Sequence, residues 1–314
     1  MSPHVVLDPI RLGASYPQAL AILAKWQPSV VFTTGGYIAI PVVAAAKTLR
    51  VPSLMWEGNL VPGRSVRATA RLASALAVSF AQTCTQLSGR CFVTGTPIRS
   101  FAGHSREDAR RTLGIDDDAP VLFVFGGSQA VRRLNRAVAE ALPTLVEKAY
   151  VLHMTGEAGY ADALKRRETL PAERRRRYRP YAFLRAEMTD ALVAADLLVG
   201  RAGSSTLAEA SALGLPMIVV PYPHASAHQV ANARALAEAG AARIVQDENF
   251  DAASLIDAAA VLEDRDELDR MCAAARSFGR PGSAAAVAEL VLALAEKSSL
   301  PSAASIERIS RAAA

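Results

Sequence analysis

Cysteine is scarce in this chain of 314 residues, and long apolar runs are missing from it. The cysteines Cys84, Cys91 and Cys272 are odd in number, and none stands in a Cys-x-x-Cys pair. This pattern argues against a disulfide framework and against a zinc site, so we expect three buried thiols. No stretch reaches the ~18–20 uninterrupted apolar residues of a spanning helix. The residues after Met1 also lack the cationic and apolar segments of a secretion signal, which predicts a cytoplasmic protein.

Charge of one sign is not in large excess either. The chain has 35 basic and 30 acidic residues, with 51% hydrophobic and 21% charged residues overall. This composition is typical of a globular protein, and its length is enough for two domains of roughly 100–200 residues each. The small basic excess permits an anionic partner but does not choose among nucleic acid, sugar nucleotide and acidic membrane surface.

Short apolar runs alternate with Ala-rich helical patterns along most of the chain. Parallel strands need helical crossovers, so this alternation predicts doubly wound α/β domains. The expected strands are 30–34, 53–56, 76–80, 91–94, 121–125, 150–154, 197–200, 217–220 and 242–245. The expected helices include 38–49, 134–145, 206–213, 229–239 and 284–294.

A polar, charge-rich stretch from Pro97 to Ala119 separates two strand–helix series. We therefore expect an N-terminal domain over residues 1–104 and a C-terminal domain over 105–280. A last helix within 281–298 is expected to pack back on the N-terminal domain. Residues 299–314 read as a flexible Ala/Ser-rich tail.

The most informative local pattern is an apolar strand, 121–125, followed by Gly126, Gly127, Ser128 and Gln129 and then a helix. Glycines let the backbone approach an anion closely, and the start of the next helix offers free amide hydrogens and a positive dipole end. Ser128 could cap the helix and also donate to a phosphate oxygen. The pattern predicts a phosphate site, with a plain capped turn as the alternative.

A second turn of this kind follows the strand 197–200 and contains Arg201 and Ser204, with Glu209 farther along the next helix. A carboxylate there can accept two ribose hydroxyls, or it can simply offset the helix dipole. A third loop, bounded by prolines, leads to His228 and Gln229 at the start of a helix. These two side chains either reach a ligand over the strand ends or cap the helix.

In this order and spacing, the three segments resemble the donor-binding half of the MurG family of glycosyltransferases. The resemblance extends upstream to Thr34-Gly35-Gly36-Tyr37, to Trp56-Glu57-Gly58-Asn59 and to 93–99, which ends in Arg99. It implies two Rossmann-like domains in the GT-B glycosyltransferase architecture. It also implies inverting transfer of N-acetylglucosamine from UDP-N-acetylglucosamine to undecaprenyl-pyrophosphoryl-N-acetylmuramyl-pentapeptide, as part of peptidoglycan synthesis.

The resemblance also implies roles for single residues of the donor site. The turn at Gly127, Ser128 and Gln129 would hold the UDP phosphates, and Arg201 and Ser204 are further expected substrate-binding residues. The backbone at Leu184 would read the uracil edge, and Glu209 would bind the ribose. His228 and Gln229 would contact the sugar hydroxyls. No metal and no cofactor are expected, because in similar enzymes helix dipoles and hydrogen bonds stabilise the leaving diphosphate.

On the acceptor side, the resemblance places Gly35, Gly36 and Tyr37 in the site for the acceptor pyrophosphate, and turns Asn59 and Arg99 toward the cleft between domains. The family begins with a strand and a Gly-rich turn ending in a candidate His base, and nothing before Val30 matches this segment. We therefore expect an incomplete N-terminal domain, with Asn59 and Glu57 as the remaining catalytic candidates.

The sequence agrees less well with other functions. The arginine-rich run 165–177 lacks the interleaved aromatics of a nucleic-acid site, and no Gly-x-Gly-x-x-Gly fingerprint of a NAD-linked oxidoreductase follows any expected strand. A different acceptor, or UDP-sugar binding without turnover, remains open. Arg64, Arg67 and Arg71 either meet anionic headgroups or belong to an ordinary exposed helix. With the resemblance, they favour a peripheral protein on the cytoplasmic face of the cell membrane.

Overall fold

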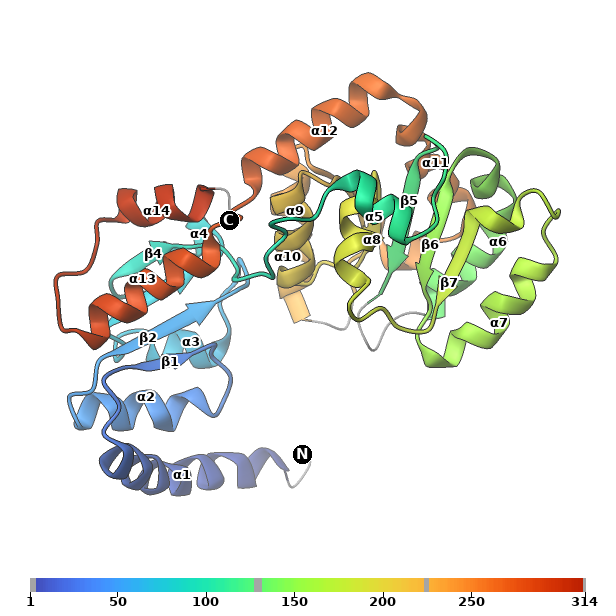
Figure 1. Cartoon of the computed structure of the whole chain (residues 1–314). Helices are drawn as coiled ribbons and strands as arrows, with labels where there is room; N and C mark the ends of the chain where they lie inside the picture. The colour runs from blue at the N-terminus through green and yellow to red at the C-terminus, as the bar shows by residue number, and fades with distance from the viewer. Residues whose placement is uncertain (1–3, 127–131, 223–225, 313–314) are drawn as a thin grey trace. The chain divides into compact units, whose positions relative to one another are not determined.

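The computed structural model describes residues 4–126, 132–222 and 226–312. The chain divides into two compact units, which are drawn in Figure 1 and described separately below. Unit 1 comprises Met1–Ile98 and Arg280–Ala313, and unit 2 comprises Arg99–Gly279. The chain thus leaves unit 1 near the predicted linker and returns to it for its last residues.

Unit 1 is built around a parallel four-stranded sheet in the order β1-β2-β3-β4. Its strands are β1 (Val31–Thr33), β2 (Ser53–Glu57), β3 (Ala75–Val78) and β4 (Cys91–Val93). The helices between them are α2 (Ala39–Thr48), α3 (Arg64–Thr69) and α4 (Ala81–Cys84), preceded by α1 (His4–Trp26). Successive strand residues face opposite sides, so Met55 packs with Val43 and Val66, while Leu54 packs on the other face.

That other face is covered by α13 (Ser283–Ala295) and α14 (Ala303–Arg311), as Figure 1 shows. Leu290 and Ile306 are fully buried there against Leu54 and Phe92. The expectation of a flexible tail over 299–314 was therefore wrong. The Ser302 side chain accepts a hydrogen bond from the Ser305 amide and so caps α14, and burial of Ile306 holds the helix on the sheet.

The cysteine prediction was wrong for two of the three residues. Cys84, at the end of α4, and Cys91, the first residue of β4, form a disulfide across a Cα–Cα distance of 5.7 Å. The tight connection from α4 to β4 brings them together, a proximity that the spacing alone did not reveal. Cys272, in α12 (Arg265–Phe278) of unit 2, is a free thiol, and burial raises its pKa.

Unit 2 is built around a parallel six-stranded sheet in the order β10-β9-β8-β5-β6-β7. Its strands are β5 (Val121–Phe125), β6 (Tyr150–Met154), β7 (Tyr178–Tyr181), β8 (Leu197–Gly200), β9 (Met217–Val219) and β10 (Ala242–Ile244). The helices are α5 (Arg106–Thr112), α6 (Arg132–Lys148), α7 (Glu157–Glu168), α8 (Met188–Ala194), α9 (Ser204–Leu213), α10 (Ser226–Glu238), α11 (Ala252–Ala259) and α12 (Arg265–Phe278). Read along the chain, this is the 3-2-1-4-5-6 order of dinucleotide-binding folds.

Two apolar layers hold this sheet between its helices. Phe123, Leu152 and Leu198 face one layer, and their neighbours Leu122 and Val151 face the other, all with no exposed surface. Strands buried on both faces read as continuous apolar runs, which explains why β5, β6 and β8 have the predicted bounds. The structure confirms the α/β, doubly wound fold class.

The strand β7 was missed. Its sequence is Tyr-Arg-Pro-Tyr, which is not an apolar run and was not among the expected strands. Because β7 lies at the edge of the sheet, its proline does not interrupt a central ladder. Burial of Tyr178 and Leu170 against the layer containing Val151 holds the segment in place.

Candidate functional site

The strand order of unit 2 reverses between β5 and β8, and this is where the two predicted glycine turns emerge. The strands run parallel with Phe125 opposite Gly200, so both turns begin at the same edge of the sheet. A Cβ on Gly200 would lie 3.1 Å from the Phe125 carbonyl oxygen, so glycine allows this close packing. In doubly wound folds, ligands bind outside the carboxyl ends of the strands at such a reversal. The predicted contacts Gly127, Ser128 and Gln129 lie outside the described residues.

The turn after β8 leads directly into α9, whose first residue is Ser204. The N-cap residue is Gly203, which supplies no side-chain hydrogen bond, and the first turn has no acidic residue. The first-turn amides and the positive end of the helix dipole therefore remain available to an anion. This arrangement can bind a phosphate.

Glu209 lies in α9 and is only 9% exposed. Its Oε1 atom accepts a hydrogen bond from Arg99 Nε at 2.7 Å, within unit 2. The structure thus brings together two predicted site residues that are 110 positions apart in the sequence. The ion pair leaves the Arg99 side chain 41% exposed and fixes one carboxylate oxygen of Glu209.

Arg201 is buried, and its contacts are internal. Its Nη1 atom donates to the Val220 carbonyl oxygen at 3.0 Å and to Asp247 Oδ1 at 2.5 Å. The guanidinium also lies over the Tyr222 ring, 5.3 Å from its centroid. These contacts tie the turn after β8 to the segments that follow β9 and β10. The structure thus gives Arg201 a structural role that the sequence analysis did not anticipate.

The helix α10 presents His228 and Gln229 near its start, and both are half-buried. Gln229 Oε1 accepts a hydrogen bond from the Tyr222 amide at 3.0 Å and so ties the first turn of α10 to the segment after β9. Asn232, which the sequence analysis missed, is fully buried and donates from Nδ2 to the Ala202 carbonyl oxygen at 3.3 Å. It follows Gln229 by three positions, a helical spacing that could have identified it.

Leu184, the predicted reader of the uracil edge, follows β7 at the carboxyl edge of the sheet. Its side chain is buried, and its amide lies 3.4 Å from the Met154 sulfur. The neighbouring Phe183 is 62% exposed. The base-reading role of the Leu184 backbone stays a prediction.

In unit 1, Gly35 and Gly36 follow β1 with φ angles of +82° and +80°, which favour glycine over other residues. A Cβ on Gly35 would also lie 2.9 Å from Val66 Cγ2. Tyr37 is 71% exposed and directly follows this turn. The geometry accounts for the two glycines, and their predicted contact with an acceptor stays a prediction.

Glu57 is the anchor of the loop that carries Asn59. Its Oε1 atom accepts from the Asn59 amide at 2.9 Å and from Asn59 Nδ2 at 3.0 Å, while Oε2 accepts from the Gly63 amide at 2.9 Å. Both oxygens of this buried carboxylate are therefore engaged by the loop. The contacts favour a role in positioning Asn59 over the role of a base.

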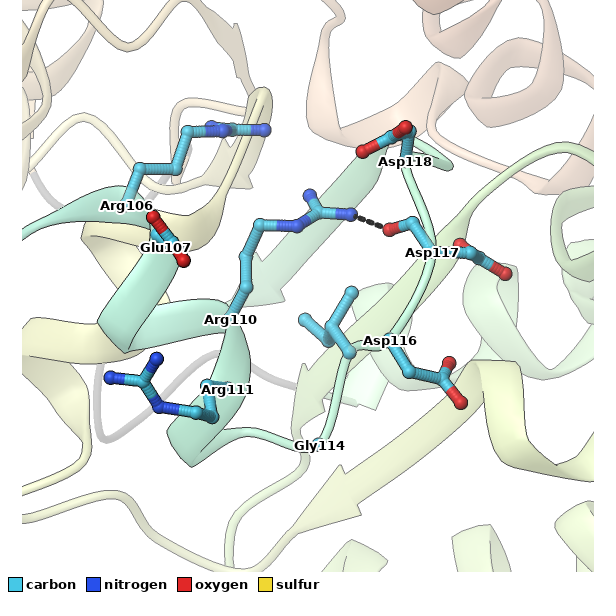
Figure 2. A pocket seen from close by; sticks show the side chains of 9 residues that line it. Arg106, Glu107, Arg110, Arg111, Gly114, Asp116, Asp117 and Asp118 are labelled. Atoms are coloured by element: carbon cyan, nitrogen blue, oxygen red, sulfur yellow. Dashed lines mark hydrogen bonds between the residues drawn. The ribbon is translucent and has the colours of Figure 1, made fainter.

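Two pockets in unit 2 differ in their place on the sheet. One, of about 830 Å³, lies beside α5 and residues 114–118, which precede β5, and so belongs to the amino edge. Figure 2 shows its lining, where Arg110 donates to the Asp117 carbonyl oxygen. The Tyr150 hydroxyl lowers the pKa of Asp116 there. This pocket is at the opposite edge from the glycine turns.

The second pocket, of about 900 Å³, lies at the carboxyl edge beside β6 and β7. Its lining includes Asn135, His153, Thr155, Tyr178 and Phe183. Among the described residues, no group of three or more His, Cys, Asp or Glu side chains could hold a metal ion. The two aspartates of the run Asp264-Arg265-Asp266 do not form such a group, and the Asp264 side chain caps α12 by accepting a hydrogen bond from the Glu267 amide.

The chain has two α/β units, each built on a parallel sheet, and the strand order of unit 2 reverses beside a turn that ends in a helix carrying an acidic residue. This arrangement is that of a glycosyltransferase of the GT-B architecture. Residues 121–286 match the model of the glycosyltransferase family 28 C-terminal domain, and residues 1–78 match that of the N-terminal domain. The chain belongs to this family, in its MurG group.

Curated relatives and a solved structure support this placement. A UDP-N-acetylglucosamine--N-acetylmuramyl-(pentapeptide) pyrophosphoryl-undecaprenol N-acetylglucosamine transferase from Chlorobaculum parvum is 40% identical, covering 90% of this chain and 78% of the relative. The enzyme of the same name from Desulforudis audaxviator is 38% identical, covering 95% and 82%. The crystal structure of Acinetobacter baumannii MurG superposes with a TM-score of 0.74 at 26% identity, covering 90% of this chain and 80% of that one.

Proposed function

We propose that this chain transfers N-acetylglucosamine from UDP-N-acetylglucosamine to the 4-hydroxyl of the N-acetylmuramyl unit of undecaprenyl-pyrophosphoryl-N-acetylmuramyl-pentapeptide. The observation that carries the proposal is the site at the strand-order reversal of unit 2. There the turn after β8 and the uncapped start of α9 suit a diphosphate, and Glu209 lies farther along the same helix. The names of the relatives supply the sugar donor and the lipid-linked acceptor.

Each part of the donor has a proposed partner in unit 2. The amides at the start of α9, with the turn after β5, hold the diphosphate, and Glu209 binds the ribose through the oxygen that Arg99 does not occupy. The backbone at Leu184 reads the uracil, and His228 and Gln229 contact the sugar. The acceptor hydroxyl attacks the anomeric carbon, and the bond to UDP breaks on the opposite face with inversion. Helix-end amides stabilise the charge that develops on the leaving diphosphate.

The acceptor side belongs to unit 1 in this proposal. Gly35, Gly36 and Tyr37 contact the acceptor pyrophosphate, and Asn59, held in place by Glu57, faces the reacting sugar. Both oxygens of Glu57 already accept hydrogen bonds, which supports a positioning role for this carboxylate in the reaction.

We further propose a peripheral position on the cytoplasmic face of the cell membrane. Arg64, Arg67 and Arg71 are exposed on and just after α3, and each cation near an anionic surface contributes about 1 kcal/mol. By length and composition alone, Arg265–Ala295 could cross a membrane. The stretch comprises the separate helices α12 and α13, and 44% of its most apolar window is buried.

The test is turnover with UDP-N-acetylglucosamine and the lipid-linked acceptor, measured as UDP release and as the mass of the lipid product. We expect acceptor-dependent release of UDP with one added N-acetylglucosamine, and loss of both in the Glu209→Ala variant. UDP binding without transfer to this acceptor would contradict the proposal. Transfer to a diacylglycerol or a small aglycone instead would assign another acceptor.

A further inference from the structure

A buried network of hydrogen bonds in unit 2 links the first turn of α6 to His153, near the carboxyl end of β6, and to Tyr178, the first residue of β7. His153 Nδ1 lies 3.0 Å from the Tyr178 hydroxyl, and His153 Nε2 lies 3.0 Å from Asn135 Oδ1. Asn135 Nδ2 then donates to the Thr155 carbonyl oxygen at 2.8 Å. His153 is 2% exposed, and Tyr178 is buried with it.

The donors and acceptors of these side chains fix which atom donates in each hydrogen bond. Asn135 Nδ2 donates to Thr155, so the Asn135 oxygen is the acceptor that faces His153. His153 Nε2 must therefore carry a hydrogen, and Nδ1 of the neutral ring accepts from the Tyr178 hydroxyl. Burial agrees with a neutral ring, because it lowers the pKa of His153 to about 3.

The network connects the two stretches that are proposed to hold opposite ends of the nucleotide. Asn135 is in the first turn of α6, which begins at Arg132, three positions after the predicted phosphate contact Gln129. Thr155, whose carbonyl oxygen accepts from Asn135, in turn donates from its amide and its Oγ1 to the Tyr181 carbonyl oxygen at 2.8 and 3.1 Å. Tyr181 ends β7, three positions before Leu184.

Gly159 leaves the space that Asn135 needs. It lies in the first turn of α7, and a Cβ built there would be 2.4 Å from Asn135 Nδ2. The φ angle of Gly159 is not in the left-handed region, so alanine fits the backbone and would be favoured by helix propensity. The absence of a side chain at this position is therefore explained by Asn135.

We propose that Asn135, His153 and Tyr178 are positioning residues for the UDP donor, which hold the start of α6 and the segment after β7 at a fixed separation. This role rests on the proposed function. The three side chains do not touch the reacting atoms. They set the spacing between the start of α6 and the proposed base-reading backbone at Leu184, so their loss weakens donor binding more than it slows the chemical step.

The experiment compares UDP affinity by calorimetry, thermal midpoint, and donor KM and kcat in matched variants. Asn135→Ala should weaken UDP binding about tenfold, and Tyr178→Phe should weaken it severalfold, with a higher donor KM and a smaller change in kcat. Tyr150→Phe is the control, because it also removes a hydroxyl hydrogen bond of a buried tyrosine, to Asp116, but at the amino end of β6. We expect it to lower the midpoint as Tyr178→Phe does and to leave UDP affinity unchanged.

Gly159→Ala removes no polar group. It therefore tests the same hydrogen-bond network without deleting a buried side chain. It should weaken UDP binding about tenfold in the wild-type background and less than twofold in the Asn135→Ala background, because Nδ2 is then absent. Equal effects of Gly159→Ala in both backgrounds, or unchanged UDP affinity in Asn135→Ala, would overturn this role alone. Absence of UDP binding by the wild-type chain would overturn the role together with the proposed function.

Discussion

The sheet of unit 2 reverses its strand order between β5 and β8, whereas the described strands of unit 1 follow one another from β1 to β4. At a reversal, neighbouring turns diverge and leave room for a ligand at the carboxyl edge. Unit 1 instead uses its buried acid, Glu57, to fix one loop. It also exposes large apolar side chains, among them Trp26, Tyr37 and Ile38.

In the proposed function, this difference separates two kinds of recognition. A compact, charged nucleotide suits the helix ends and the carboxylate of unit 2. The exposed apolar and basic side chains of unit 1 suit an amphipathic lipid acceptor. If this division is correct, substitutions in unit 1 change stability or acceptor use, and substitutions at the carboxyl edge of unit 2 change nucleotide affinity.

The largest effect is expected in unit 1, from Glu57→Ala. The change leaves the amides of Asn59 and Gly63 and the Asn59 carboxamide without their acceptor. We expect a loss of about 3 kcal/mol in the free energy of unfolding, measured by denaturant titration, and a smaller loss for Glu57→Gln, which keeps one acceptor oxygen. UDP affinity should stay within about twofold of wild type, and a tenfold loss would break the division between the units.

The disulfide of unit 1 gives the next effect. Joining Cys84 to Cys91 closes a short loop, for which chain entropy predicts about 2.5 kcal/mol of stabilisation. Reduction should lower the thermal midpoint of wild type and leave that of a Cys84→Ser, Cys91→Ser variant unchanged, with Cys272→Ser as the control. A mass shift showing three alkylated thiols in the untreated protein would refute the pairing.

In unit 2, we expect the free energy of unfolding to depend on pH by about 2 kcal/mol through His153. Burial lowers the pKa of His153 from 6.5 to about 3, so the unfolded chain takes up a proton below pH 6.5 and the folded chain does not. Stability from this group is complete above pH 6.5 and falls as the pH drops, by about 2 kcal/mol at pH 5. Denaturant titrations at pH 7 and pH 5 measure it. From pH 7 to pH 5, wild type should lose more free energy of unfolding than the His153→Gln variant. Equal losses would mean that the folded protein accepts a charged imidazole at this buried position.

The smallest change in free energy is expected for UDP binding by Glu209 variants. It tests the difference between the two units most closely, because it concerns the ligand itself. Glu209→Ala should weaken UDP binding at least tenfold, about 1.4 kcal/mol, and Glu209→Gln should weaken it less, since glutamine keeps one acceptor oxygen. The carboxylate is held by Arg99, so the unfolding free energy should be compared in parallel. Calorimetry that gives wild type and Glu209→Ala equal affinities would remove Glu209 from the site.

Much of unit 2 could be predicted from the sequence because its strands are buried on both faces. The runs at 121–125, 150–154 and 197–200 are mostly apolar, and the structure gives those bounds. The edge strand β7 was missed because an edge position tolerates Pro180 and the charged side chain of Arg179.

The contacts that organise the sites were harder to predict, because they join residues that are distant in the chain. Arg99 meets Glu209, and Asn135 meets His153, only after the sheet has formed. The three bonds to Glu57 depend on the path of a loop, which residue types alone do not determine. The turn after β8 could be predicted because its pattern is local to a strand end and the next helix.

The central claim is that the carboxyl edge of unit 2 binds the nucleotide, and hydrogen exchange with and without UDP tests it most directly. We predict slower exchange on saturation with UDP in peptides covering 132–136, 182–185 and 200–209, and unchanged exchange in peptides covering 33–37 and 57–63 of unit 1. Protection by UDP in the unit 1 peptides, with none at the strand-order reversal of unit 2, would contradict the account.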